Sequence, residues 1–166
     1  MFLKQLNIIN FKNCNEANLE LSSKVNCFLG NNGEGKTNLL DAIYYLSFCK
    51  SYFNSIDSQN IKHDEPFFVI EGIYENNTKD ETVYCGLKRN QKKIFKRNKK
   101  NYDRLADHIG TIPLVIISPI DVLLIIEGSD IRRKFVDGII SQYDKNYLNH
   151  LLNYNKALHH RNLLLK

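Results

Sequence analysis

The octapeptide Gly30–Thr37, which reads GNNGEGKT, decides how the rest of the chain is interpreted. It matches the G-x-x-x-x-G-K-S/T pattern of a phosphate-binding loop, which is a strong signal only between a strand and a helix. An apolar run typical of a strand, Val25–Leu29, precedes the octapeptide. Behind it, apolar residues recur at helical spacing, namely Leu39, Leu40, Ile43 and Leu46. We therefore expect a strand, a phosphate-binding loop and a helix in succession.

The residue types of the loop suit a polyphosphate ligand. Backbone N–H groups point at phosphate oxygens only where φ is positive and no β-carbon intervenes, so glycine is expected at positions 30, 33 and 35. The helix beginning near Lys36 contributes the positive end of its dipole. We expect the Lys36 ammonium to bind the β- and γ-phosphates and the Thr37 hydroxyl to hold Mg²⁺. The residues predicted to bind a nucleoside triphosphate are Gly30, Asn31, Asn32, Gly33, Glu34, Gly35, Lys36 and Thr37.

The composition is that of one ordinary domain with a hydrophobic core. The chain has 166 residues, of which 43% are hydrophobic, close to the size of a single domain. The N-terminus lacks the apolar core of a signal peptide, and no apolar run is long enough to cross a bilayer. The four cysteines lie far apart without a C-x-x-C pair, which favours reduced thiols over a metal site or disulfides. We therefore predict a cytoplasmic protein without a membrane partner.

Positive charge is concentrated in one short stretch, 88–104, which we call the basic hairpin. The net charge of the whole chain is +5, yet this stretch holds nine basic residues and one acidic residue, and the remainder is net acidic. Such a run is either a solvated surface or a site that contacts DNA phosphates irrespective of base sequence. The residues predicted to contact DNA are Lys88, Arg89, Lys92, Lys93, Lys96, Arg97, Lys99 and Lys100.

Alternating apolar residues predict an antiparallel sheet laid over the nucleotide core. Strands are expected at 2–11, 17–21, 67–74, 82–87 and 92–97. The first two are expected to form a hairpin beside the strand Val25–Leu29, and Ile94 is expected to point inward. Asn76-Asn77 is expected to form a tight turn. The sheet would thus carry the basic hairpin at its end.

The second part of the chain is predicted to be mostly helical. The continuous apolar run Leu114–Ile117 predicts a buried strand, and 120–126 a short amphipathic or buried element. A helix is expected to start at 128–130 with Ser129 as its N-cap. Helical spacing then continues from Tyr147 to the end without a stop signal, which suggests that the chain is a cut piece of a longer protein.

A P-loop ATPase also needs an acidic strand end, the Walker B motif, to hold Mg²⁺. Glu71 and Glu127 each follow four apolar residues, but each is better explained as a surface carboxylate. No L-S-G-G-like signature motif occurs either. The chain on its own is therefore expected to bind nucleotide poorly and to hydrolyse it negligibly.

Three stretches together resemble the RecF family, bacterial recombination-mediator ATPases with an ABC-type head related to SMC proteins. Leu6–Asn13 resembles the family's strand ending in N-F-R/K-N/S, and Gly30–Ile43 resembles its G-x-N-G-x-G-K-T-N-x-L-E-A-I stretch. The most discriminating stretch is Ser118–Asp137, which resembles S-P-x-D-x-x-L-I/V-x-G-x-P-x-x-R-R-x-F-L-D. The last residues, 154–166, fit a further family segment.

The chain departs from the family at two positions. Asp130 stands where the family has proline, and both residue types suit a first helical turn. Phe53 stands where many relatives have arginine, which weakens the expectation of a phosphate or DNA contact at this position.

The resemblance implies an α/β fold, the P-loop NTPase fold of an ABC/SMC-like head of RecF type. Residues 1–117 would be the N-terminal part of ATPase domain I, with the antiparallel sheet over the nucleotide core. Residues 118–166 would begin the helical domain II. Lys12 matches a basic residue near the nucleotide in related heads, and Asp121 falls in a loop that links nucleotide to dimer state. Arg132 and Arg133 are equally well explained by ion pairs on the helix and by a phosphate or partner contact.

The function that the resemblance implies is DNA replication, recombinational repair and SOS induction. Two heads would sandwich two ATP molecules with Mg²⁺, giving an ATP-dependent homodimer and a slow DNA-dependent ATPase in the complete protein. The protein would bind single strands and duplex near gaps, and would help to load RecA together with RecR/RecO-type mediator proteins.

Two other classes of function remain open from the residues themselves. One is a P-loop kinase acting on a small molecule, which would need Glu71 or Glu127 as metal ligand. The other is a DNA-binding module that uses ATP only as a structural ligand.

Overall fold

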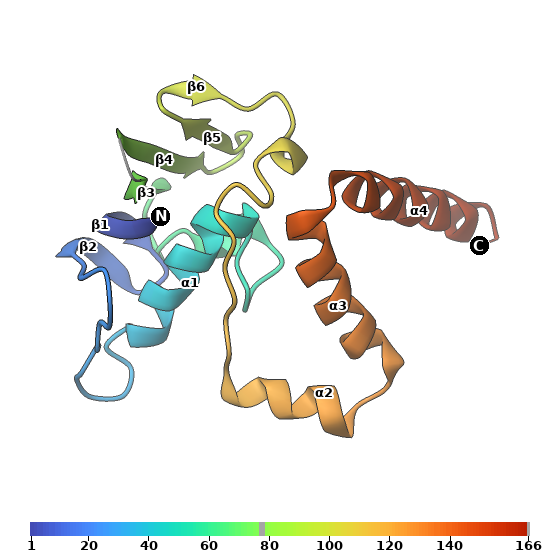
Figure 1. Ribbon diagram of the computed structural model, residues 1–166, viewed down its shortest axis with the longest axis horizontal. Coiled ribbons are helices and arrows are strands. Elements are labelled where there is room, and N and C mark those ends of the chain that lie inside the picture. Colours follow the sequence, from blue (N-terminus) through green and yellow to red (C-terminus); the bar gives the residue numbers. More distant parts are fainter. Residues whose placement is uncertain (77–78, 166) are drawn as a thin grey trace. The chain divides into compact units, whose positions relative to one another are not determined.

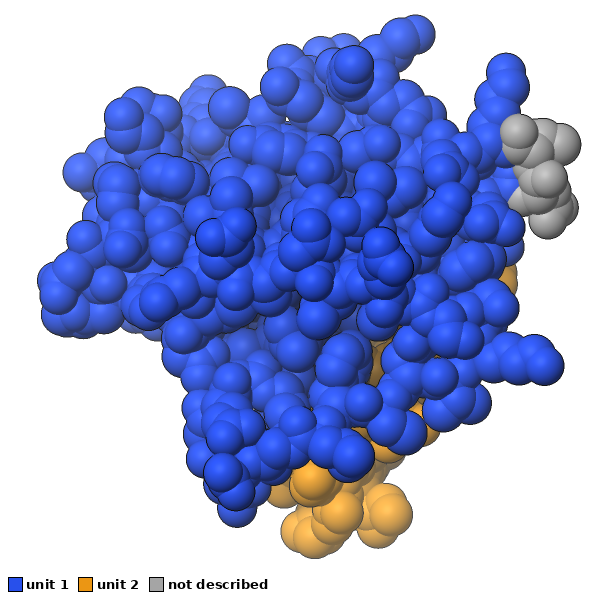
Figure 2. Space-filling model, turned by 90° about the vertical axis from the view of Figure 1, so that its left-hand side faces the viewer, with its two compact units in different colours: residues 1–108 blue, residues 109–166 orange. Residues whose placement is uncertain are grey.

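The computed structural model describes residues 1–76 and 79–165, in two compact units that comprise residues 1–108 and 109–166 (Figure 2). The first unit is mixed α/β and holds an antiparallel sheet with one long helix (Figure 1). The second unit is mainly helical. None of the described helices combines the length and the apolar character that a membrane span requires. The division between units falls at 108/109, and the domain boundary at 117/118 stays a prediction.

The sheet of the first unit has six antiparallel strands in the order β2-β1-β3-β4-β5-β6. Their bounds are Phe2–Phe11 (β1), Cys14–Glu20 (β2), Phe67–Asn76 (β3), Lys79–Lys88 (β4), Ile94–Arg97 (β5) and Lys100–Asn101 (β6). Two short 3-10 helices, η1 (Asp57–Asn60) and η2 (Leu105–Asp107), lie in the connections. Strands β1, β3, β4 and β5 are each paired on both sides.

Helix α1, Lys36–Phe48, begins at the glycine-rich loop and packs on one face of this sheet (Figure 1). Three buried rings meet edge to face there: Phe11 of β1, Tyr45 of α1 and Phe68 of β3, with centroids 5.3–6.0 Å apart. Gly72 of β3 allows this close approach, because a β-carbon at that position would lie 2.7 Å from Leu46 Cδ1. The core therefore fixes the helix that follows the loop.

The predicted sheet is confirmed in outline and corrected in detail. β1 has the predicted bounds, whereas β2 begins at Cys14 instead of residue 17, because the turn takes only two residues. The expectation for Ile94 was wrong: its side chain is 48% exposed and Phe95 is buried. The register pairs Phe95 with the buried Cys85, and neighbouring residues of a strand point to opposite faces. The predicted turn at Asn76-Asn77 lies partly outside the described residues, since Asn76 ends β3.

Two of the predicted strands do not form in the described chain. Val25–Leu29 has no regular secondary structure and no strand partner, and Leu29 is 90% exposed. Leu114–Ile117 likewise has no strand partner, although the Leu114 amide donates to Gln142 Oε1 at 2.8 Å, and Ile117 is 84% exposed. An apolar run needs a hydrogen-bonded neighbour to become a strand, and no described segment supplies one. The hairpin β1–β2 therefore lies beside β3 and not beside Val25–Leu29.

The second unit contains η3 (Pro119–Val122), α2 (Leu123–Ile126), α3 (Ser129–Tyr143) and α4 (Lys145–Leu164). The N-cap of α3 is Gly128, one residue before the predicted Ser129, within the usual uncertainty of helix ends. Asp144 caps α4 by accepting hydrogen bonds from the amides of Asn146 and Tyr147. The segment 120–126 is not buried, since Ile125 is 83% exposed.

Candidate nucleotide-binding site

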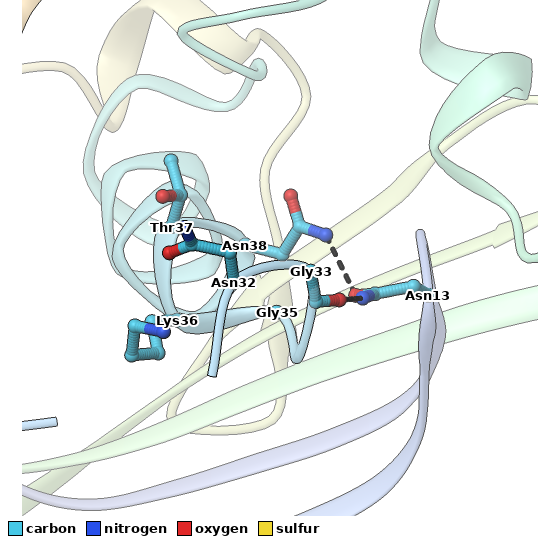
Figure 3. A pocket seen from close by; sticks show the side chains of 7 residues that line it. All are labelled: Asn13, Asn32, Gly33, Gly35, Lys36, Thr37 and Asn38. Atoms are coloured by element: carbon cyan, nitrogen blue, oxygen red, sulfur yellow. Dashed lines mark hydrogen bonds between the residues drawn. The ribbon is translucent and has the colours of Figure 1, made fainter. Parts of the chain in front are cut away.

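The glycine-rich loop has the backbone that its sequence predicts. The φ angles of Gly30, Gly33 and Gly35 are 148°, 89° and 99°, so positive φ is confirmed at all three positions. Gly35 is the N-cap of α1, and no side chain caps that helix end. The unpaired N–H groups of the first helical turn therefore face the loop, as in an anion-binding helix terminus. The pocket at this point is lined by Asn13, Asn32, Gly33, Gly35, Lys36, Thr37 and Asn38 (Figure 3).

Two charged side chains of the loop fold back onto its own backbone. Lys36 Nζ donates to the carbonyl oxygens of Gly30 at 2.8 Å and Asn31 at 2.6 Å. Glu34 accepts a hydrogen bond from the Asn31 amide at 3.0 Å and from its side chain at 3.1 Å. Phosphate oxygens would compete with these carboxylate and carbonyl oxygens for the same donors. The loop therefore carries both the donors and the cation that a polyphosphate needs.

Thr37 is exposed in the first turn of α1 and lines the pocket. Within 1–76 and 79–165 no three His, Cys, Asp or Glu side chains gather as a metal site. Mg²⁺ keeps several waters and takes few protein ligands beside substrate phosphates. The Thr37 hydroxyl fits that role, because it would supply one hard oxygen ligand to Mg²⁺.

Neither alternative acidic residue lies at the end of a strand. Glu71 sits in the middle of β3, paired with Asn7 on one side and Tyr84 on the other. Glu127 is exposed and follows the short helix α2. The expected surface position is confirmed for Glu127. It was wrong for Glu71, which is half-buried because β3 is paired on both sides.

Lys12 lies in the turn between β1 and β2, with a left-handed φ of 54°. Its ammonium is 2.6 Å from the buried carboxylate of Asp41 on α1, and the Lys12 side chain is 16% exposed. The Ser51 hydroxyl and the Tyr52 amide also donate to Asp41, at 2.6 and 2.7 Å. Lys12 does not line the pocket, although its neighbour Asn13 does.

Asn13 is a site residue that the sequence reasoning missed. Its Nδ2 donates to the Gly33 carbonyl at 2.8 Å, and its Oδ1 accepts from Asn38 Nδ2 at 2.7 Å (Figure 3). A polar residue in a tight turn carries no periodic signal. The one signal in the sequence that pointed to Asn13 was its place at the end of Leu6–Asn13, the first of the three stretches that resemble the RecF family.

The residues of the basic hairpin are not equivalent. Five of the predicted DNA contacts are exposed, namely Lys88, Arg89, Lys92, Lys99 and Lys100. Lys96 is half-buried, with its ammonium 5.6 Å from the ring of Tyr84. Arg97 pairs with Glu81, whose pKa is lowered by hydrogen bonds from Asn76 and Arg97.

Lys93 is part of a mostly buried polar network. Its side chain is 10% exposed, and Nζ lies 2.7 Å from Asp57 Oδ2 and 2.5 Å from the Cys49 carbonyl oxygen. Tyr45 donates to the same Asp57 carboxylate and accepts from Lys93 at 3.1 Å. These bonds attach the start of β5 to the C-terminal end of α1.

In the second unit, the two arginines of the third resembling stretch make local contacts. Arg132 donates to the carbonyl oxygens of Leu124 and Glu127, at 3.2 and 2.8 Å. Arg133 pairs with Asp130 one turn earlier, and hydrogen bonding from Arg133 lowers the pKa of that carboxyl group. Arg133 thus has the ion pair of one of the two alternatives that the sequence left open, whereas Arg132 bonds only backbone carbonyl oxygens.

Comparison with known proteins places this chain in a defined family. The model of the AAA domain family matches residues 5–162. The DNA replication and repair protein RecF of Phocaeicola vulgatus is 65% identical over 167 residues, which cover 100% of this chain and 45% of that protein. The protein of the same name from Bacteroides fragilis is 61% identical with the same coverage. The chain spans about half the length of the curated relatives it matches.

Solved structures agree with the sequence relatives. A structure of the recombination mediator protein RecF with ATP has a TM-score of 0.89 and 38% identity, and covers 99% of this chain and 46% of that chain. An SMC ATPase structure has a TM-score of 0.65 at 16% identity, over 87% of this chain and 100% of that chain. The second likeness shows the fold alone, which is that of an SMC-like ATPase head.

Proposed function

Because this chain belongs to the AAA domain family, we propose that it forms the ATP-binding part of a RecF-type protein of DNA replication and recombinational repair. The observation that carries the proposal is the loop with three positive-φ glycines before the uncapped start of α1. That arrangement presents N–H donors to phosphates. In the complete protein, ATP with Mg²⁺ joins two such heads into a homodimer, and slow DNA-dependent hydrolysis separates them.

Lys36 is the residue whose loss tests ATP binding directly. Lys36→Met in the complete protein removes the only lysine of the loop, and we expect ATP binding to fall at least about 100-fold. Lys24→Met is the matched control, because Lys24 is an exposed lysine upstream of the loop. Calorimetric titration with Mg·ATP measures both, and sedimentation with and without ATP measures the dimer. ATP binding that survives Lys36→Met contradicts the proposed site.

The DNA surface that we propose is the exposed subset of the basic hairpin, and Lys93 and Arg97 serve the fold instead. Salt dependence is measured as the slope of log K for DNA binding against log salt concentration. Replacing four exposed lysines by glutamine should make that slope shallower by about 3–4. The four are Lys88, Lys92, Lys99 and Lys100. Glutamine at Lys24 and Lys50, which are exposed elsewhere, is the control. An unchanged slope in the fourfold variant contradicts DNA contact at the hairpin.

The remaining roles belong to the complete protein. We propose that it works in the cytoplasm, binds DNA near gaps and helps to load RecA with RecR/RecO-type partners during repair and SOS induction. The 65% identity to a protein named DNA replication and repair protein RecF supports a role in repair. ATP-independent DNA affinity would instead favour a module in which ATP is only a structural ligand.

A further inference from the structure

We propose that Asn13 is a positioning residue of the nucleotide-binding site, whose side-chain amide clips the glycine-rich loop to the start of α1. The inference rests on the proposed binding of ATP and adds a residue from outside the loop to it. Asn13 need not contact the nucleotide to act in this way.

The clip uses both ends of one planar amide group. Asn13 Nδ2 donates to the carbonyl oxygen of Gly33 in the loop at 2.8 Å, and Asn13 Oδ1 accepts from the side chain of Asn38 on α1 at 2.7 Å. Figure 3 shows the Asn13 side chain reaching the loop from the neighbouring strand connection, with both bonds drawn. A single rigid group thus sets the position of the loop apex relative to the helix start.

The base of the clip is held independently of the loop. Lys12, the preceding residue, donates its backbone N–H to the Asn60 carbonyl oxygen at 2.9 Å and pairs with the buried Asp41 carboxylate at 2.6 Å. Asp41 lies on α1, so the same turn is fastened to the helix at two places. The Asn13 side chain therefore extends from a fixed point.

Close packing at Gly35 points to the same role. A β-carbon built on Gly35 would lie 2.7 Å from Asn13 Oδ1, which is shorter than any ordinary carbon–oxygen contact. The amide oxygen thus lies directly against the backbone at the start of α1, where unpaired N–H groups gather. Any displacement of Asn13 would let this part of the loop move.

Preorganisation is the physical reason why such a clip matters for affinity. A loop that is already ordered loses less conformational entropy when it binds, so its N–H groups bind phosphate more tightly. Losing both hydrogen bonds should weaken ATP binding about tenfold in Asn13→Ala, and losing one should weaken it about threefold in Asn38→Ala. Asn13→Asp should be at least as weak as Asn13→Ala, because a carboxylate cannot donate to Gly33 O and repels phosphates.

The test is calorimetric titration of the complete protein and its variants with Mg·ATP. The matched control is Asn26→Ala, which also removes one donated and one accepted hydrogen bond, both to Ser22, at 2.9 and 2.7 Å and outside the loop. We expect ATP affinity within twofold of wild type for this control. We also expect equal thermal unfolding midpoints for Asn13→Ala and Asn26→Ala without nucleotide, and a raised KM with unchanged kcat for Asn13→Ala.

A double variant that combines Asn13→Ala with Asn38→Ala distinguishes a clip from two residues that act independently. A clip predicts that the double variant binds ATP no more than twofold weaker than Asn13→Ala alone, because the shared amide is already gone. The proposal would be overturned if the loss of ATP affinity in the double variant equalled the product of the two single losses. It would also be overturned if the ATP affinity of Asn13→Ala were within twofold of wild type. A wild-type protein that binds no ATP would instead overturn the proposed function on which the clip rests.

Discussion

β3 and the segment Val25–Leu29 are both rich in apolar residues, yet β3 is a buried strand and Val25–Leu29 is an exposed segment without regular structure. In β3, Phe68 and Ile70 are completely buried, whereas in the other segment Val25 is 78% and Leu29 90% exposed. β3 is hydrogen-bonded to β1 and β4 and covered by α1 on one face. Val25–Leu29 has no strand neighbour in the described parts of the chain. Apolar sequence therefore permits a strand, and a hydrogen-bonded neighbour is what produces one.

The largest expected effect is on the buried ring cluster. Phe68→Ala removes a fully buried ring that contacts Phe11 and Tyr45, and should lower the free energy of unfolding by about 3–5 kcal/mol. Leu29→Ala should change it by less than about 0.5 kcal/mol, because the side chain is exposed. Urea denaturation measures both. Similar losses in the two variants would show that Leu29 is buried in solution and would break the comparison.

Thiol reactivity sharpens the comparison at single residues. Cys85 of β4 is completely buried, and Cys27 in the unpaired segment is exposed. Burial raises the pKa of Cys49 to about 12 and raises that of Cys85 well above its ordinary value. Because only the thiolate reacts, iodoacetamide at pH 8 should label Cys27 at least about 100-fold faster than Cys49 or Cys85.

Peptide mass spectrometry reads these rates, and labelling in concentrated urea is the control, since all thiols should then react at similar rates. A raised pKa keeps the buried thiols neutral at pH 8, so their labelling should accelerate as the pH rises toward 12. Slow labelling of Cys27 in the folded protein would contradict the exposure of the segment Val25–Leu29.

A smaller effect is expected where α1 approaches the sheet. Gly72→Ala places a methyl group 2.7 Å from Leu46 Cδ1, and should destabilise the protein by about 1–3 kcal/mol through overpacking. Gly138→Ala in α3 is the matched control, because nothing lies within 4 Å of its new methyl group. It should stabilise the protein by up to about 1 kcal/mol. Thermal unfolding should move in opposite directions for the two variants, and a shift of the same sign would contradict the packing.

Local pattern was enough for β1, the glycine-rich loop and α1. Strict alternation around Leu6 and Ile8 set the bounds of β1, and the glycines at positions 30, 33 and 35 have the positive φ that phosphate binding requires. Lys93 shows where pattern fails, since it belongs to a charge run and is nevertheless mostly buried against Asp57. A run of basic residues in the sequence does not show which of the side chains are exposed. Only the packing shows which cations remain able to bind a phosphate.

By itself, the sequence determined the glycine-rich loop that we propose binds phosphate and the helix behind it, because backbone φ and helix start are local properties of Gly30–Thr37. Tertiary structure alone decided that Asn13 reaches Gly33 and that Phe95 and not Ile94 points inward. It also decided that Val25–Leu29 has no strand partner among the described residues. Each of these depends on strand register or on a partner distant in sequence, and register is set by the whole sheet. Long-range pairing therefore completes a site whose chemistry a short motif defines.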